Sequence, residues 1–261
     1  MTLNDSNVPT ATSVKPQMTV VNTDHDVAVA AADRVAEVLR RDPSAAICLP
    51  TGSTPLGMFR EILRRSAAGE MNISQMNLFL LDEYLGQTRD DEASLTNWLE
   101  KEFLGPGNIQ AHVHYVPSAE PDPEAAAAKY DAEIASYGGF KLAVLGLGPN
   151  GHIAFNEPGS AHDSRTRVLD LTPESRNQSS AYWDGREEIP AQAMTVGVGT
   201  LLEADQIVLI VTGANKAEIL RKALEEPLTA DVPASWLRLA ADRLEVIVDK
   251  AAASALTSVS L

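Results

Sequence analysis

The chain has 261 residues, 44% of them hydrophobic, and its 21 basic and 36 acidic residues give a formal net charge of −15. This length and hydrophobicity allow a full core, which excludes an intrinsically disordered protein. The negative charge repels nucleic acid and anionic membranes, and no apolar run approaches the roughly 18 residues of a membrane span. We therefore expect a folded protein that binds neither nucleic acid nor membrane.

The N-terminus and the cysteine content both predict a cytoplasmic protein. The first residues show no basic region followed by an apolar stretch, so they do not form a secretory signal. Cys48 is the single cysteine and cannot form an intrachain disulfide. Because it lies in an apolar run, we expect it to be a buried structural thiol.

From residue 18 onward, short apolar runs alternate with amphipathic segments. The polar residues 1–17 predict a disordered tail. Strands are predicted at 18–22, 45–50, 76–82, 112–116, 141–146, 206–212 and 244–248. Helices are predicted at 25–41, 54–68, 93–104, 122–137, 214–226 and 233–242.

Several predicted strands carry apolar residues on both faces, which is typical of a parallel sheet covered by helices on each side. The alternation of strands and helices indicates a doubly wound α/β fold with right-handed crossovers. No shift in composition divides the chain, so residues 18–261 are expected to form a single domain. Residues 156–191 form a long irregular stretch, which predicts a lid segment.

In open α/β sheets, ligands bind outside the carboxyl ends of the strands. Thr51, Gly52, Ser53 and Thr54 follow the second predicted strand, with Thr54 expected as a helix N-cap and Pro55 as the first helical residue. A glycine, hydroxyl groups and free helix N–H groups can cradle an anion. The alternative is a capped turn that binds nothing. A Walker A loop is excluded, because no Gly-Lys-Ser/Thr follows.

Two adjacent carboxylates, Asp82 and Glu83, leave the third predicted strand. Carboxylates at the end of an apolar strand are costly to desolvate unless they are paired or used. Asp82 is placed to act as a base that removes a proton next to a carbonyl group. The alternative is a solvated pair at the strand end.

Residues 146–151 read G-x-G-x-x-G, and Asp170 lies near the distance expected of a ribose-binding acid. A dinucleotide site of this type needs a long helix that begins at the third glycine. Pro158 would stop such a helix within two turns, so we reject this interpretation.

The glycine turn is instead expected to aim Asn150, His152 and Glu157 into one pocket. His152 can transfer protons near neutral pH, with the other two side chains orienting it and setting its charge. Lys216 follows the sixth predicted strand at a helix N-terminus, where the helix dipole is already positive. A bound phosphate would relieve that conflict; otherwise the lysine is a surface cation. The other histidines lack the spacing of metal ligands, and no metal site is predicted.

Four segments together resemble the glucosamine-6-phosphate deaminase family, in the family's order and at about its spacing over roughly residues 30–250. They are LPTGSTPLGMF (49–59), FLLDEYLG (79–86), LGLGPNGHIAFNEPGS (145–160) and TVGVGTLL (195–202). GHIAFNEP is the most specific part, because the related 6-phosphogluconolactonases lack Asn-Glu-Pro after their Gly-His. The resemblance implies a Rossmann-like α/β sheet and no cofactor. It also implies conversion of glucosamine 6-phosphate to fructose 6-phosphate and ammonia.

The resemblance also implies a role for each matching residue. Asp82 would move the proton between C2 and C1 of the sugar, and His152, with Glu157 as its partner, would open the sugar ring. The phosphate would be held by Thr51, Gly52, Ser53, Thr54 and Lys216.

Three positions depart from the pattern of the family. Asn150 stands where some members have aspartate, so it can orient the histidine without adding charge. Ala181 stands where the lid usually carries a phosphate-binding arginine. Leu169 replaces a lysine of allosteric members, which argues against allosteric activation. The arginines left to compensate for Ala181 are Arg165, Arg167 and Arg176.

The residues leave three other functions open. The same scaffold could carry a 6-phosphogluconolactonase-like hydrolase, which would not need the Asp82 proton transfer. The same reaction could act on galactosamine 6-phosphate. A non-catalytic sugar-phosphate sensor is the third, although the set of Asp82, His152 and Glu157 argues against it. The expected partner is a small-molecule sugar phosphate, and a homo-oligomer stays open.

Overall fold

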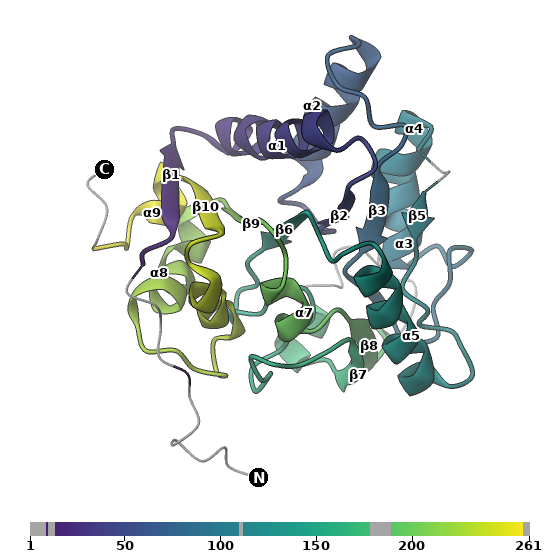
Figure 1. Cartoon of the computed structure of the whole chain (residues 1–261). Coiled ribbons are helices and arrows are strands. Elements are labelled where there is room, and N and C mark those ends of the chain that lie inside the picture. Colours follow the sequence, from purple (N-terminus) through teal and green to yellow (C-terminus); the bar gives the residue numbers. More distant parts are fainter. Residues whose placement is uncertain (1–8, 10–13, 110–111, 178–188, 258–261) are drawn as a thin grey trace.

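The computed structural model describes residue 9 and residues 14–109, 112–177 and 189–257. Its centre is a seven-stranded sheet in which all neighbouring strands are parallel (Figure 1). In spatial order the strands are β1 (Gln17–Val21), β10 (Leu244–Asp249), β9 (Ile207–Val211), β6 (Leu142–Gly146), β2 (Ala46–Leu49), β3 (Asn77–Leu80) and β5 (Val113–His114). All seven predicted strands contribute to this sheet, and the predicted α/β class is confirmed.

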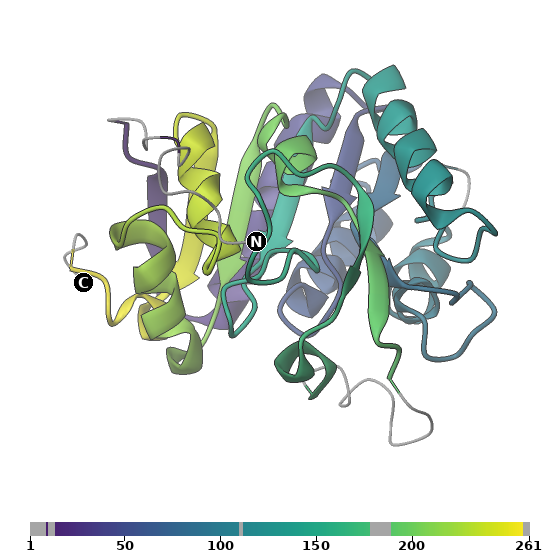
Figure 2. The same cartoon turned by 90° about the horizontal axis from the view of Figure 1, so that it is seen from below.

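Helices cover both faces of the large sheet. Figure 1 shows α1 and α2 on one side, with α5 and α7 on the other. The view from below in Figure 2 looks onto the side that carries α5, drawn in teal. The α-helices that surround the sheet are α1 (Asp24–Arg41), α2 (Leu56–Ala67), α5 (Pro123–Ser136), α7 (Val198–Leu202), α8 (Ala217–Glu225) and α9 (Lys250–Ala253).

The boundaries of α1 follow from its sequence. Thr23 caps the helix by accepting a hydrogen bond from the backbone N–H of Asp26, whose carboxylate accepts from the backbone N–H of Thr23 in return. Arg40 and Arg41 lie in the last turn, where positive charges interact favourably with the negative end of the helix dipole. Apolar residues recur every three or four positions and form the buried face: Val27, Ala28, Ala31, Ala32, Val35, Val38 and Leu39.

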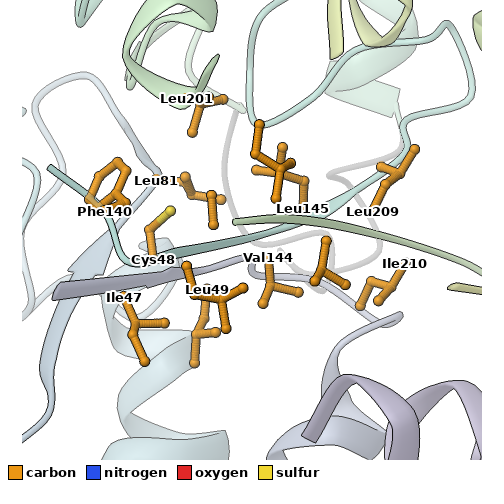
Figure 3. Packing of buried hydrophobic residues seen from close by; sticks show 14 of the residues in the cluster. Ile47, Cys48, Leu49, Leu81, Phe140, Val144, Leu145, Leu201, Leu209 and Ile210 are labelled. Atoms are coloured by element: carbon orange, nitrogen blue, oxygen red, sulfur yellow. The ribbon is translucent and has the colours of Figure 1, made fainter. Parts of the chain in front are cut away.

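The core lies on both faces of the central strands. Figure 3 shows Cys48 on one face of β2 and its neighbours Ile47 and Leu49 on the other. All three side chains are at most 1% exposed. Burial raises the pKa of the Cys48 thiol far above its usual range. The predicted buried structural thiol is therefore confirmed.

A second, antiparallel sheet of three strands was not predicted as such. It consists of β4 (Asp82–Tyr84), β8 (Gln192–Thr195) and β7 (Arg167–Asp170). The strand predicted at 76–82 is thus wrong as one element, because β3 ends at Leu80 and β4 begins two residues later in the other sheet. The short strands β7 and β8 lack the alternation of apolar residues that identifies longer strands.

Residues 156–191 are not irregular throughout, because β7 lies within them and residues 173–177 are helical. Residues 178–188, the part of the predicted lid that contains Ala181, lie outside the described residues. The predicted tail also lies largely outside them, and β1 begins at Gln17. Within the described ranges, the structure contains no helix that is long and apolar enough to cross a membrane.

Several predicted helices are shorter or of another type. The helix predicted at 93–104 divides into α3 (Leu95–Leu99) and the π-helical turn η2 (Glu100–Leu104), followed by α4 (Gly105–Gly107). The helices predicted at 214–226 and 233–242 contain 3₁₀ segments, which are η3 (Ala214–Lys216) and η4 (Pro233–Ala240). The short helices α7 and α9 were not predicted.

The glycines of the TVGVGTLL segment (195–202) allow the start of α7 to lie against the loop that contains Ser164 and Arg165. A Cβ added to Gly197 would lie 2.2 Å from the carbonyl oxygen of Ser164 and 2.4 Å from that of Arg165. The backbone N–H of Gly199 donates to the same Ser164 carbonyl at 2.9 Å. Because the opposing atoms are backbone, they cannot move aside without moving the loop.

We expect Gly197→Ala to lower the free energy of unfolding by about 1–3 kcal/mol, because the added methyl group overpacks this contact. Gly146→Ala is the matched control, since a Cβ there meets nothing within 4 Å. Urea unfolding of both variants measures the effect. Equal stability of the two variants would contradict the close approach.

Candidate active site

A cavity of about 340 Å³ opens beyond the carboxyl ends of β2, β3, β6 and β9. This is the edge at which an open α/β sheet binds its ligands. The residues predicted from the sequence that line it are Thr51, Gly52, Ser53, Thr54, Asp82, His152 and Lys216. Asn150 and Glu157 do not line the cavity and contact His152 instead. The structure therefore brings the predicted site residues together: seven line the cavity, and Asn150 and Glu157 contact His152 from outside it.

The turn between β2 and α2 presents backbone donors to the cavity. Gly52 has a φ of 103°, a left-handed conformation that favours glycine. Within the described part of the chain, the backbone N–H groups of Thr51, Gly52 and Thr54 form no hydrogen bond. The expected N-cap role of Thr54 is wrong, because α2 begins at Leu56 with Pro55 as its cap residue and no side-chain cap bond. The turn thus presents unbonded backbone donors to the cavity and is not closed by a side-chain cap.

Lys216 is half-buried at the cavity wall, at the end of η3. Burial lowers the pKa of its ammonium group, and the negative charge of Glu174 opposes this effect. Among the described residues, no carboxylate lies within ion-pair distance of Lys216. A half-buried cation without an ion-pair partner favours an anionic ligand.

None of the three arginines considered as replacements lines the cavity. Arg165 forms an ion pair with Glu203, with its Nη1 2.8 Å from a carboxylate oxygen. Arg167 donates to the side-chain oxygen of Asn156 at 2.9 Å. Arg176 donates to a backbone carbonyl at 3.1 Å. Of the cavity-lining residues that the structure describes, only Lys216 has an ammonium or guanidinium group.

Asp82 is a buried carboxylate on the cavity wall, only 6% exposed. Burial, with a smaller contribution from the negative charge of Glu83, raises the pKa of Asp82 to about 8. No hydrogen bond to this carboxylate is formed by the residues that the structure describes. A carboxyl group held in this way exchanges its proton near neutral pH, as a general base requires.

Glu83, the second carboxylate of the pair, has a separate structural task. It accepts hydrogen bonds from the backbone N–H groups of Leu95 and Thr96, at 3.0 and 2.8 Å. These N–H groups lie at the start of α3, so the carboxylate also interacts favourably with the positive end of the helix dipole. Leu95 and Trp98 of α3 line the cavity. Glu83 therefore fixes one wall of the site, a role that the sequence analysis missed.

The imidazole of His152 lies directly over Gly148. A Cβ added to Gly148 would lie 2.2 Å from the ring, so this glycine is required by the packing of the histidine. The backbone N–H of His152 donates to the side-chain oxygen of Asn150 at 3.1 Å. The amide nitrogen of Asn150 in turn donates to Glu157 at 2.8 Å. An aspartate at position 150 could not donate this second bond.

Glu157 lies behind His152 and is 5% exposed. Burial acts to raise the pKa of Glu157, but its interactions with His152, Ser175 and Asn150 outweigh this effect and lower it. One carboxylate oxygen lies 3.6 Å from Nδ1 of the histidine. The carboxylate therefore supplies the negative charge that the asparagine lacks.

Thr172 and Ser175 were missed by the sequence analysis. Thr172 donates to Glu157 at 3.2 Å, and the hydroxyl of Ser175 lies 3.2 Å from Nδ1 of His152. The sequence does contain a pattern that indicates a helix start at these residues. Thr-Pro-Glu-Ser has the form of a helix start, and the backbone N–H of Ser175 donates to the side chain of Thr172 at 3.2 Å.

The glycine turn does not have the form of a dinucleotide site, because no helix begins at Gly151. Among the described residues, no group of three or more His, Cys, Asp or Glu side chains is arranged to hold a metal ion. The expectation that the protein needs no cofactor stays a prediction.

Comparisons with known proteins agree with the motifs. The family model described as glucosamine-6-phosphate isomerases/6-phosphogluconolactonase matches residues 21–246. Glucosamine-6-phosphate deaminase of Corynebacterium aurimucosum is 42% identical over 241 residues, which cover 92% of this chain and 94% of that protein. The protein of the same name from Rhodopirellula baltica is 39% identical over 235 residues, 89% of this chain and 93% of that one.

Solved structures show the same likeness. The structure of a monomeric glucosamine-6-phosphate deaminase superposes with a TM-score of 0.87 at 31% identity, covering 92% of this chain and 99% of that one. A 6-phosphogluconolactonase from Trypanosoma cruzi superposes with a TM-score of 0.76 at 21% identity, covering 95% and 99%. At that identity the second likeness shows a shared fold alone.

The raised pKa of Asp82 predicts a pH dependence of stability. The folded protein binds the Asp82 proton with a pKa of about 8, against 3.8 for an ordinary aspartate. The unfolded chain therefore releases this proton first, and the contribution of Asp82 to the free energy of unfolding falls as the pH rises from about 4 to about 8. Asp82→Asn removes this contribution, so we expect the variant to be more stable than wild type at pH 8, by a few kcal/mol.

Urea unfolding of wild type and Asp82→Asn at pH 5 and pH 8 measures this difference. Asp90→Asn, at an exposed aspartate, is the matched control and should follow wild type at both values. If the stabilities of wild type and Asp82→Asn change in parallel with pH, Asp82 has an ordinary environment.

Proposed function

This chain belongs to the glucosamine-6-phosphate isomerase/6-phosphogluconolactonase family, and we propose that it is a glucosamine-6-phosphate deaminase. It converts glucosamine 6-phosphate and water to fructose 6-phosphate and ammonia. The relatives from Corynebacterium aurimucosum and Rhodopirellula baltica carry this activity in their names. We further propose that it acts in the cytoplasm on the free sugar phosphate.

The observation that carries the proposal is the position of Asp82. A buried carboxylate lines the same cavity as the Thr51–Thr54 turn and Lys216, which together supply donors for a phosphate. A reaction that moves a proton between neighbouring sugar carbons needs such a base. Hydrolysis of a lactone does not, so the arrangement favours isomerisation with deamination over the lactonase alternative.

Binding of the phosphate comes first in the proposed mechanism. The phosphate accepts hydrogen bonds from the backbone N–H groups of Thr51, Gly52 and Thr54 and from the ammonium group of Lys216. Backbone donors at the start of α2 and a charged donor are the usual elements of a phosphate site. This remote binding energy holds the sugar carbons in place for the chemistry.

His152 then opens the sugar ring. The closed aminosugar must lose the proton of its C1 hydroxyl and gain one on the ring oxygen, and an imidazole can do both. The negative charge of Glu157 stabilises the imidazolium that exists between these two transfers. The product of this step is the open-chain aldehyde.

Asp82 acts on the aldehyde. Its carboxylate removes the proton from C2, which the neighbouring carbonyl group acidifies, while the carbonyl oxygen takes a proton from the ammonium group of the substrate, and the product is an enolamine. The proton held by Asp82 then passes to C1 and leaves a protonated imine at C2. Water adds to C2, the C–N bond breaks, and ammonia leaves. The remaining product is the ketose phosphate.

We expect Asp82→Asn to lower kcat for deamination by about 10²–10⁴-fold or more, because the base is lost. Binding of the substrate should change little, since the amide keeps the size of the side chain. Ammonia release measures the first quantity and calorimetric titration the second. Near-normal turnover would contradict the role of Asp82.

We expect Lys216→Met to lower kcat/KM about 10- to 150-fold, because a charge-assisted hydrogen bond contributes about 1.5–3 kcal/mol. Lys129→Met removes the same charge from an exposed position on α5 and serves as the matched control. If both variants behave alike, the phosphate does not lie beside Lys216.

A substrate panel tests the proposed function as a whole. Glucosamine 6-phosphate, galactosamine 6-phosphate and 6-phosphogluconolactone are offered to the wild-type protein, with release of ammonia and of acid as the two signals. We expect ammonia from glucosamine 6-phosphate. Acid from the lactone without ammonia from either aminosugar would establish the hydrolase instead, and no turnover at all would favour a sensor.

A further inference from the structure

The contact between His152 and Glu157 is not a direct hydrogen bond. Nδ1 of the imidazole lies 3.6 Å from the nearer carboxylate oxygen, which is beyond hydrogen-bond length. Two hydroxyl groups lie beside this gap. The Ser175 hydroxyl is 3.2 Å from Nδ1, the two hydroxyl oxygens are 3.1 Å apart, and the Thr172 hydroxyl is 3.2 Å from Glu157.

We propose that Ser175 and Thr172 form a hydroxyl relay that connects Nδ1 of His152 to the carboxylate of Glu157. Nδ1–H donates to the Ser175 hydroxyl, which donates to the Thr172 hydroxyl, which donates to the carboxylate. In this relay both residues are positioning residues, because they act through the histidine, although Ser175 also lines the cavity. The inference rests on the proposed function for its catalytic meaning, but not for the relay itself.

The number of available protons sets the direction of the relay. Each hydroxyl group has one proton to donate. Interactions within the site lower the pKa of Glu157, so the carboxylate is charged at neutral pH and is the strongest acceptor in the group. Thr172 therefore donates to Glu157, and its oxygen accepts from Ser175. Ser175 has then used its proton, so it accepts from Nδ1–H.

This direction determines which nitrogen of His152 faces the substrate unprotonated. With the proton on Nδ1, Nε2 carries the free lone pair. The Nε2 edge of the ring lies against Gly148, which lines the cavity. The resting enzyme is thus ready to accept the proton of the C1 hydroxyl. When it does so, the imidazolium still donates into a chain that ends on a negative charge.

The local backbone holds the two hydroxyl groups in place. Thr172 accepts a hydrogen bond from the backbone N–H of Ser175 at 3.2 Å, at the start of the helical turn 173–177. Ser175 is 2% exposed, so its hydroxyl group has little access to water. The cap bond uses the backbone of Ser175 but not its hydroxyl. Ser175→Ala therefore removes the relay and keeps the cap.

The test measures the position of the ring proton of His152 and the rate of the reaction in separate experiments. In the full-length protein, ¹⁵N NMR of the imidazole ring reports which nitrogen carries the proton. We expect the Nδ1–H form to dominate in the neutral imidazole of wild-type His152. In Ser175→Ala that preference should be lost, whereas Ser175→Thr should keep it. His114, whose Nδ1 contacts Glu133 at 2.6 Å, is an internal control in the same spectrum.

The kinetic arm uses glucosamine 6-phosphate. We expect Ser175→Ala to lower kcat about 10-fold with little change in KM, because one hydrogen bond to a charged group is lost. Ser175→Thr should restore turnover. A merely structural role would change the urea midpoint and leave the ring proton on Nδ1.

The relay is overturned if the Nε2–H form dominates in wild type, a result that needs no variant. It is equally overturned if folded Ser175→Ala keeps both the wild-type tautomer and the wild-type kcat. Absence of any turnover by wild type would reject the proposed function instead. The NMR arm would still decide the relay in that case.

Discussion

The chain leaves the large parallel sheet at Leu81 and enters the small antiparallel sheet at Asp82. The carboxyl end of β3 is thereby joined to a strand that pairs with β8, and β8 also pairs with β7. Asp82 stands opposite Thr195 in this pairing, at the wall of the cavity. Because backbone pairing continues past the strand end, the carboxylate stays buried instead of turning into solvent. Its raised pKa, and the chemistry proposed for it, depend on this change of sheet.

The electrostatics of the site are local, in a protein whose overall charge is −15. The long-range field opposes an anionic substrate, but salt screens exposed charges over about 8 Å at physiological ionic strength. Short-range donors can therefore prevail. The structure supplies them as backbone N–H groups of the Thr51–Thr54 turn and one half-buried ammonium group, that of Lys216. Arg165 and Arg167, by contrast, are occupied with partners outside the cavity.

Two pairs of polar side chains divide their tasks in the same manner. Glu83 uses its charge to hold the start of α3, which leaves Asp82 without a structural duty. Asn150 uses both ends of its amide, accepting from the backbone of His152 and donating to Glu157. Glu83 thus fixes the geometry beside Asp82, and Asn150 fixes it beside His152. Asp82 and His152 are therefore the members of the two pairs that are available for proton transfer. Burial of the Asp82 carboxylate lowers the free energy of unfolding at high pH, and the rest of the fold must offset this loss.

The sequence by itself determined the parallel sheet, the helices around it and the clusters at its strand ends. Apolar runs and glycine turns are local signals, and the carboxyl ends of parallel strands necessarily meet at one edge. It did not determine that Asp82 starts a new sheet, that Glu83 caps α3, or that Thr172 and Ser175 contact His152 and Glu157. The contacts of Glu83, Thr172 and Ser175 join segments 12 to 23 residues apart in the chain, and Asp82 pairs with Thr195, 113 residues further on. No local pattern records them, because only the packing of the two sheets decides which side chains meet.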